Sequence, residues 1–356
     1  MTPSADFWRG RRVLLTGHTG FKGVWTALWL EKLGAVVGGI ALAPETSPDL
    51  WTMVGRPLEA DGFLDIRHAD EVRDRVAAFA PEIVIHMAAQ ALVHASYGDP
   101  AGTFDTNVMG LIRVLDACRA TPSVRAVVNV TSDKCYENRE QIWAYREDDA
   151  MGGSDPYSAS KGCAELVTAS YRKSFFSAPG GARLASGRAG NVIGGGDWSA
   201  DRLIPDCVRA FEANKPVVIR NPLATRPWQH VLEPICGYLT LAQKLFESGD
   251  SVAEGWNFGP ADTDAWPVRQ VLDGIIEAWS DGASWVQDDA AHPKEAMLLR
   301  VDATKARVRL GWQPRLPLPL ALRWTVDWYH NVRAGSSARD LTLEQIAAFE
   351  QLAKIH

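Results

Sequence analysis

The sequence predicts an α/β protein built on a doubly wound parallel sheet, with a smaller, mixed C-terminal domain that binds a substrate. Three observations support this fold class. Apolar runs typical of strands alternate with helical patterns, these runs are continuously apolar, and a glycine-rich turn connects the first strand to the first helix. Continuous Val, Ile and Leu runs are typical of parallel strands that helices cover on both faces. We therefore expect helices on both sides of the sheet.

The N-terminal half alternates between strands and helices. The first strand, "RVLLTG", leads into a helix that ends at Gly34, and the apolar run "AVVGGIAL" forms the next strand. In chain order we expect strands over 12–17, 35–42, 60–66, 82–89 and 125–132, and helices over 23–34, 68–80, 101–119 and 157–176. The pattern changes after about residue 190, where glycine, proline and tryptophan become denser and short segments replace the regular alternation.

Composition and charge exclude several classes of protein. The chain has 37 Lys and Arg against 43 Asp and Glu, without a basic block that would neutralise DNA or RNA, so nucleic acid is excluded as a partner. No apolar run approaches the roughly 20 residues that span a bilayer, which predicts no membrane partner. The five scattered cysteines lack the paired spacing of a zinc site or a disulfide framework. We therefore expect no metal and a reducing, cytoplasmic location.

The glycine-rich turn is the first candidate site. Gly17, Gly20 and Gly23 are spaced three apart between the first strand and the first helix. Such a turn brings backbone N–H groups and the positive helix end toward a pyrophosphate, which predicts a dinucleotide site of the Rossmann type. No Arg near the second strand is placed to hold a 2′-phosphate, so NAD is favoured over NADP. We therefore assign 1–190 to an NAD-binding Rossmann domain and 191–356 mainly to a substrate-binding domain, with some segments returning to the first.

The second candidate site is "DPYSASKGCAEL", residues 155–166. Asp155 and Pro156 are typical of a helix start, which places Tyr157 and Lys161 four residues apart on one helical face. A lysine ammonium near a phenol lowers the pKa of the phenol, so Tyr157 would accept a proton from a sugar hydroxyl. Lys161 would also hold the nicotinamide ribose. The alternative is an ordinary surface pair of Tyr and Lys.

These residues and several longer stretches resemble a known family. Thr16 to Gly23, Asn107, "VTSDKCY" (130–136), Tyr157 with Lys161, and "RAGNVIGGGDW" (188–198) resemble, over nearly the whole chain, the extended short-chain dehydrogenase/reductases that act on nucleotide sugars. The stretches "TGHTGFKG", "SDKCYEN", "DPYSASKGCAE", "GNVIGGGDW" and "RPWQHVLEP" are similar to the 4,6-dehydratase branch that uses CDP-glucose. The resemblance implies conversion of CDP-D-glucose to CDP-4-keto-6-deoxy-D-glucose, with tightly held NAD that is reduced and reoxidised in each turnover.

The resemblance also implies catalytic roles. Tyr157, with Lys161 beside it, takes the proton of the C4 hydroxyl while hydride leaves C4, and Ser132 hydrogen-bonds the same oxygen. The resulting ketone acidifies the C5 proton, so that water can leave across C5 and C6. Related dehydratases place Asp and then Glu after the hydroxyl residue, whereas this chain has Asp133 and Lys134. Asp133 would protonate the departing C6 hydroxyl if enclosure raises its pKa. Lys134 is either the C5 base, when neutral, or a fixed cation that stabilises the enolate or holds Asp133.

The remaining site residues come from the same resemblance. The residues expected to bind NAD are Gly17, His18, Thr19, Gly20, Phe21, Gly23, Asp65, Ile66, Ala88, Ala89, Gln90, Asn107, Tyr157 and Lys161. The residues expected to bind the nucleotide sugar are Asn191, Arg202, Arg226, His292 and Glu295. His18 and Lys22 would touch the cofactor phosphates or the sugar, and Asn107 would hold the strand geometry near the site. Asp65 and Ile66 have an equal alternative as a helix-capping Asp and a core Ile.

Two other functions stay open. One is a dehydratase or 4-epimerase for another nucleotide sugar; an epimerase needs no acid and base beyond the tyrosine, so Asp133 and Lys134 argue against it. The other is a non-catalytic NAD-binding regulator, which would have no need to keep the hydroxyl, phenol and amine groups together. The helices over 101–119 and 157–176 resemble those through which relatives pair, which implies a homodimer or homotetramer.

Overall fold

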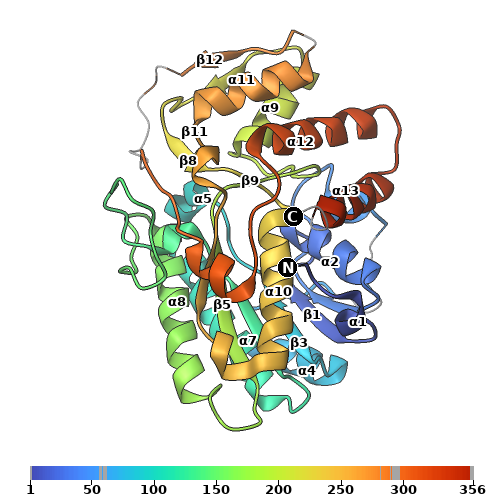
Figure 1. The fold of residues 1–356 in the computed structure, drawn as a ribbon, viewed down its shortest axis with the longest axis vertical. Coiled ribbons are helices and arrows are strands. Elements are labelled where there is room, and N and C mark those ends of the chain that lie inside the picture. The colour runs from blue at the N-terminus through green and yellow to red at the C-terminus, as the bar shows by residue number, and fades with distance from the viewer. Residues whose placement is uncertain are drawn as a thin grey trace.

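The computed structural model describes residues 2–55, 58, 62–280, 282–288, 290 and 297–352. At its centre lies a six-stranded sheet in the order β10-β5-β4-β3-β1-β2, in which every neighbouring pair is parallel (Figure 1). These strands are β1 (Arg12–Thr16), β2 (Val36–Ile40), β3 (Ile83–His86), β4 (Ala126–Val130), β5 (Arg183–Ala189) and β10 (Gly255–Phe258). The predicted α/β class with a parallel Rossmann-type sheet is confirmed.

Helices cover both faces of the sheet. They are α2 (Phe21–Lys32), α4 (Ala69–Phe79), α7 (Leu111–Ala120), α8 (Pro156–Ser174) and α10 (Leu232–Ser248). Successive strand residues alternate between two apolar cores, because side chains along a strand point to opposite faces. Leu14 and Val127 lie in the core formed with α4, α7 and α8, whereas Leu15 and Val128 lie in the core formed with α2 and α10. Both faces of the sheet are therefore buried under helices, which explains why the strands are continuously apolar.

The second half of the chain contributes a separate group of elements beyond the end of the sheet, at the top of Figure 1. Its helices are α9 (Leu203–Glu212), α11 (Val268–Trp279) and α12 (Leu318–Arg333). Its strands form two-stranded sheets, which are β6 (Val192–Ile193) with β9 (Gln229–His230), β7 (Val217–Ile219) with β12 (Trp285–Gln287), and β8 (Thr225–Pro227) with β11 (Ala265–Pro267). Three other elements of the second half belong to the first group. α10 packs on the central sheet, β10 is its edge strand beside β5, and α13 (Ala338–Leu352) packs on α2. The division at residue 190 stays a prediction.

Two predicted elements differ from the structure. The described residues between 60 and 66 form no strand, and Phe63 makes only an isolated bridge to Ala41. The helix expected over 101–119 is interrupted by a π-helical turn between two α-helical parts. Its pieces are α6 (Pro100–Phe104), η1 (Asp105–Gly110) and α7. Such turns are frequent at functional sites. The other predicted strands and helices are confirmed to within a few residues at their ends.

The sequence analysis missed two central strands, β5 and β10. Both carry buried polar side chains, namely Ser186 and Arg188 in β5 and Asn257 in β10, which interrupt the apolar pattern. Short helices were also missed. They are α1 (Ala5–Trp8), α3 (Leu50–Met53) and α5 (Val93–Gly98).

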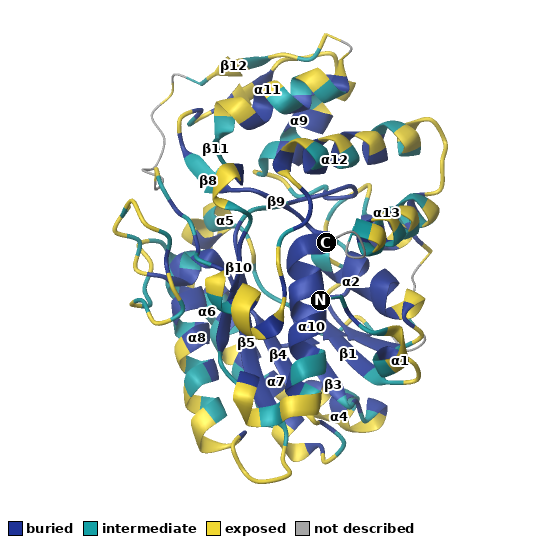
Figure 2. Ribbon diagram, in the orientation of Figure 1, coloured by how far each residue is buried: buried dark blue, intermediate teal, exposed yellow. Residues whose placement is uncertain are grey.

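Burial is concentrated in the sheet and in the helix faces that cover it, as the dark strands of Figure 2 show. Among the described residues, no helix is long and apolar enough to span a membrane. Within the same residues, no group of three or more His, Cys, Asp or Glu side chains is placed to hold a metal ion. All five cysteines are unpaired thiols.

Candidate active site

The candidate site lies at the carboxyl ends of the central strands. β1 lies between β2 and β3 in the sheet. The connection after β1 therefore leads to β2 at one edge, and the connection after β3 leads to β4 toward the other edge. In open α/β sheets this change of direction opens a crevice where ligands bind. The turns that follow β1, β3, β4 and β5 carry most of the predicted site residues.

The glycine turn between β1 and α2 fits a pyrophosphate. Gly17 has a φ of +74°, and a Cβ there would lie 2.8 Å from the backbone nitrogen of Ala88 at the end of β3. A Cβ on Gly23 would lie 2.1 Å from the carbonyl oxygen of Gly17. Gly20 is the N-cap of α2 and provides no side-chain cap, so the first amides of the helix have no partner within the helix. These amides and the helix dipole are suited to an anion.

Three side chains of this turn contact other parts of the protein. The His18 ring is fully buried, and its centroid lies 4.8 Å from that of Trp51. Thr19 donates its hydroxyl proton to the carbonyl oxygen of Leu42, and Phe21 packs against the core. The side chains of Thr19 and Phe21 stay partly exposed, whereas that of His18 is enclosed by the protein. Contact of the His18 side chain with the cofactor phosphates or the sugar stays a prediction.

Two polar side chains fix the strand ends beside this turn. The hydroxyl oxygen of Thr16 accepts hydrogen bonds from the backbone nitrogens of Met87 and Ala88, both at 3.1 Å, which ties the end of β1 to that of β3. In the π-helical turn, Asn107 accepts a hydrogen bond from the backbone nitrogen of Gln90 at 2.8 Å and donates to its carbonyl oxygen at 3.0 Å. Asn107 thus holds the segment after β3, and the π-helical turn places it there. Thr16 was quoted in the sequence pattern without this role.

Asp65 and Ile66 make structural contacts. The Asp65 carboxylate forms an ion pair with Arg67 at 2.7 Å and accepts a hydrogen bond from the backbone nitrogen of Arg67, which lowers the pKa of Asp65. Ile66 is buried against Gly110, where a Cβ would lie 2.6 Å from the Ile66 side chain. Asp65 is not the cap of α4, because His68 holds that position. Adenine contact by these two residues stays a prediction.

The five predicted catalytic side chains come together. Ser132 ends the segment after β4, and its hydroxyl donates to Asp133 Oδ1 at 3.0 Å. Helix α8 begins at a well-capped end, because Asp155 accepts a hydrogen bond from the backbone nitrogen of Ser158, and this fixes Tyr157 in the first turn. The Nζ atoms of Lys134 and Lys161 lie 5.8 and 5.9 Å from the centroid of the Tyr157 ring.

Burial dominates the electrostatics of this cluster. Desolvation raises the pKa of Tyr157 to about 12, although the Ser132 hydroxyl lowers it in part. The expectation that Lys161 lowers the pKa of Tyr157 below its ordinary value is therefore wrong for the protein alone, since burial of the phenolate outweighs the nearby charges. Burial also lowers the pKa of Lys161 to about 8. The pKa of Asp133 is raised by burial, against the opposing charge of Lys134, as the role of a proton donor requires.

Further charged groups line the same cluster. Burial lowers the pKa of Lys22 to about 8, and the charges of Arg202 and Lys161 add to this effect. The carboxylates of Asp133 and Asp197 oppose it. Asp197 is buried and forms an ion pair with Arg202 at 3.0 Å. Asp197 stands in the quoted "GGGDW" motif, but sequence reasoning gave it no role; an acidic residue directly after three glycines is the signal that would have found it.

The other predicted substrate residues are placed unequally. Arg226 lies in β8, and its charge lowers the pKa of Asp133, so it faces the same cluster. Asn191 directly follows the Gly190 position, and its carbonyl oxygen accepts a hydrogen bond from the backbone nitrogen of Gln229 at 3.1 Å. His292 and Glu295 lie outside the described residues.

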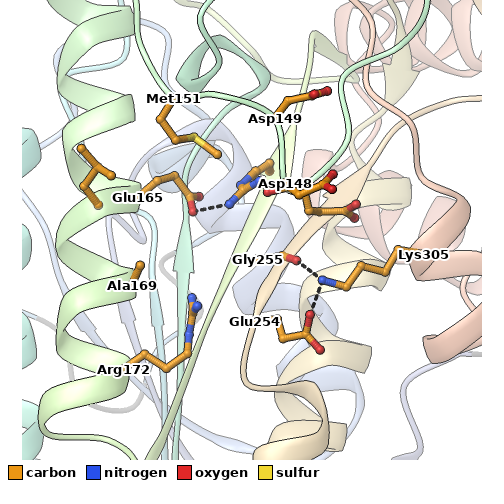
Figure 3. A pocket seen from close by; sticks show the side chains of 12 residues that line it. Asp148, Asp149, Met151, Glu165, Ala169, Arg172, Glu254, Gly255 and Lys305 are labelled. Carbon is orange, nitrogen blue, oxygen red and sulfur yellow. Dashed lines mark hydrogen bonds and ion pairs between the residues drawn. The ribbon is translucent and has the colours of Figure 1, made fainter.

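A buried ion pair, which the sequence analysis missed, contacts the residue that precedes Ser132. Glu165 on α8 and Arg188 on β5 are paired at 2.7 Å, and their side chains are 3% and 6% exposed. Glu165 also accepts hydrogen bonds from the hydroxyls of Thr131, which precedes Ser132, and Ser186. The pair lines a pocket of about 400 Å³ between α8 and the start of β10, whose lining contains none of the five proposed catalytic residues (Figure 3).

Breaking this pair is expected to destabilise the fold. Glu165→Ala leaves the Arg188 guanidinium buried without its counter-ion, which should lower the free energy of unfolding by about 3–5 kcal/mol. The midpoint of urea denaturation measures this change. Asp70→Ala, which removes an exposed partner of Arg73, is the control and should leave the midpoint unchanged. An unchanged midpoint for Glu165→Ala would show that the buried pair does not stabilise the fold.

The chain is similar in sequence to known nucleotide-sugar dehydratases. A family model described as GDP-mannose 4,6 dehydratase matches residues 14–323. The chain is 52% identical over 329 residues to the CDP-glucose 4,6-dehydratase of Salmonella typhimurium, which covers 91% of this chain and 92% of that protein.

Two solved structures show the same fold. The UDP-glucose 4-epimerase of Thermotoga maritima, solved with UDP-glucose, superposes with a TM-score of 0.78 at 19% identity, covering 90% of this chain and 99% of that one. The dTDP-glucose 4,6-dehydratase of Bacillus anthracis, in complex with NAD, superposes with a TM-score of 0.73 at 19% identity, covering 90% and 97%. At this identity the two structures support the fold alone.

Proposed function

The chain belongs to the GDP-mannose 4,6-dehydratase family of NAD-dependent nucleotide-sugar enzymes, and from this premise we propose that it converts CDP-D-glucose to CDP-4-keto-6-deoxy-D-glucose and water. It is then a hydro-lyase. The observation that carries the proposal is the convergence of Ser132, Asp133 and Lys134 on Tyr157 and Lys161, in a chain 52% identical to a CDP-glucose 4,6-dehydratase.

The cofactor is NAD. When bound, it would take the C4 hydride of the sugar and return it to C6, so the reaction has no net redox change. The amides at the start of α2 would hold the pyrophosphate, and the close approach of Gly17 to Ala88 leaves no side chain in its way. Asn107 and Gln90 would keep the segment after β3 in place beside the nicotinamide half.

Tyr157 and Ser132 act at C4. Tyr157 takes the proton of the C4 hydroxyl as hydride leaves, and Ser132 hydrogen-bonds the same oxygen. Lys161 lies within 5.9 Å of the Tyr157 ring centroid, where its charge favours the phenolate once ligands are bound. Because burial raises the pKa of Tyr157 to about 12 in the protein alone, the base needs this positive surrounding to form.

Asp133 and Lys134 act at C5 and C6. Burial raises the pKa of Asp133, which favours the protonated carboxyl that the departing C6 hydroxyl requires. Lys134 either removes the C5 proton as a neutral amine or stabilises the enolate as a fixed cation. Arg202 and Arg226 border the cluster and would bind the diphosphate by their forked guanidinium groups. Asn191 would assist them, and substrate binding by His292 and Glu295 stays a prediction.

We further propose a homodimer, or a pair of such dimers, located in the cytoplasm. Large apolar side chains are exposed on helix α8, at its C-cap and on the π-helical turn before α7. They are Leu166 at 61% exposure, Phe175 and Met109. Packing of α7 and α8 against the same helices of a second copy would cover them. Five unpaired cysteines are suited to a compartment where thiols stay reduced.

A substrate panel tests the proposed function. The purified protein is incubated with CDP-, dTDP-, UDP- and GDP-glucose and a catalytic amount of NAD, and the alkaline absorbance of a 4-keto-6-deoxy sugar is followed. We expect a signal with CDP-glucose only. A signal with another nucleotide sugar would show that the enzyme recognises a different base. Formation of a 4-epimer without keto sugar would show that the protein is an epimerase and not a dehydratase.

A further inference from the structure

The proposed catalytic side chains come from two separate segments of the chain. Ser132, Asp133 and Lys134 follow β4, whereas Tyr157 and Lys161 lie in the first turns of α8. Both segments must reach the same sugar, and in an active site a displacement of about 1 Å costs up to about 100-fold in rate. The contacts that hold the end of β4 in place against α8 therefore bear on the reaction.

Two buried hydrogen bonds join β4 to α8. Along this face of the strand, Val127 packs in the apolar core with α8, and Asn129 and Thr131 follow at alternate positions. The Asn129 side-chain amide donates to the hydroxyl oxygen of Thr168 at 2.8 Å, and the Thr131 hydroxyl donates to Glu165 Oε1. The four polar residues are buried. Because hydrogen bonds are directional and apolar contacts are not, these bonds fix the position of the helix along the strand.

Glu165 is itself held by β5. Its second oxygen, Oε2, accepts a hydrogen bond from the Ser186 hydroxyl at 2.8 Å and one from the Arg188 guanidinium at 2.7 Å. The backbone nitrogen of Thr131 donates to the carbonyl oxygen of Gly187 at 2.9 Å. Both partners of the Thr131–Glu165 bond are therefore tied to residues 186–188 of β5. A buried charge pair costs desolvation that well-packed apolar side chains would avoid, so stability alone does not explain this arrangement.

We propose that Glu165 is a positioning residue, which acts through Thr131 to hold Ser132 against the catalytic face of α8. This inference rests on the proposed dehydratase function. Glu165 lies one helical turn after Lys161, and Thr131 directly precedes Ser132, so one hydrogen bond joins the two catalytic segments. The charge of Glu165 also opposes the effect of burial on the pKa of Lys161, which favours the ammonium form.

Thr131→Val tests this contact, because it removes the hydroxyl and leaves the ion pair of Glu165 with Arg188 in place. We expect kcat on CDP-glucose to fall by about 10–100-fold, since Ser132 is no longer held in line with the groups on α8. KM should stay close to the wild-type value, because the proposed diphosphate contacts are unchanged. Thr131→Ser keeps a hydroxyl and should restore kcat. Initial rates of keto-sugar formation over a range of CDP-glucose concentrations give both constants.

Thr168→Val is the matched control. It removes a buried hydroxyl from the other bond between β4 and α8, two strand residues farther from Ser132. The midpoint of urea denaturation should fall by similar amounts in the two valine variants, whereas only Thr131→Val should lower kcat. An equal loss of kcat in both, normal kcat in Thr131→Val, or a Thr131→Ser variant as slow as Thr131→Val would overturn the positioning role. A wild type that forms no keto sugar would instead overturn the proposed function.

Discussion

Tyr157→Phe is expected to lower kcat on CDP-glucose by about 10²–10⁴-fold, the range that general acid–base groups contribute. This corresponds to about 3–5 kcal/mol of transition-state stabilisation. The substitution keeps the ring and removes only the oxygen that accepts the C4 proton. Bound NAD should persist, because the glycine turn and the Asn107–Gln90 contacts do not involve the phenol. Steady-state keto-sugar formation and the NAD content of the purified variant provide the two measurements.

Tyr171→Phe is the matched control for this variant. It removes the same hydroxyl from the same helix, where Tyr171 is bonded to Asp116 at 3.2 Å and lies in the part of α8 remote from Ser132. We expect kcat close to the wild-type value. Normal turnover by Tyr157→Phe, or an equal loss in both variants, would remove the assignment of Tyr157 as the base at C4.

The central fold could be predicted from the sequence because three of its strands are continuously apolar. β1, β3 and β4 are buried on both faces, so their apolar runs are continuous. β5 was not predicted because Ser186 and Arg188 belong to a buried polar network, in which Glu165 on α8 supplies the counter-charge. A pattern of neighbouring residues along the chain does not contain that partner, which lies 23 residues away.

The candidate site was predictable where chemistry sits in short motifs. The turn after β4 and the first turns of α8 each bring their groups together locally, and the parallel sheet then brings the two motifs side by side. The pKa shifts of the site residues could not be predicted from the sequence. A Tyr with a Lys four residues on suggests a lowered phenol pKa, yet the direction depends on desolvation, which only the packed structure gives. The approach of Lys22 to Asp197 has the same origin, because the two come from opposite halves of the chain.

Asp133→Asn is expected to stop the reaction after C4 oxidation. The amide keeps an oxygen that accepts the Ser132 hydrogen bond but has no acidic proton for the C6 hydroxyl, so keto-sugar formation should fall by about 10²–10⁴-fold. Loss of the carboxylate charge also removes an effect that raises the pKa of Tyr157, so proton removal at C4 should not be impaired. The near-ultraviolet absorbance of reduced nicotinamide should therefore rise to about one equivalent per site and persist.

The pH dependence provides a second measurement on the same variant. Asp133 donates only when protonated, so wild-type kcat falls as pH rises through the pKa of Asp133, which burial displaces above that of an ordinary carboxyl group. Asp133→Asn should lose this decline from its residual rate, whereas Asp116→Asn, at an exposed carboxylate on α7, should keep it together with full activity. If Asp133→Asn accumulates no reduced nicotinamide, hydride transfer is lost as well, and the carboxyl acts at C4. The proton donor to the C6 hydroxyl would then be a neighbouring ammonium group such as that of Lys22, whose charged form the Asp133 carboxylate favours.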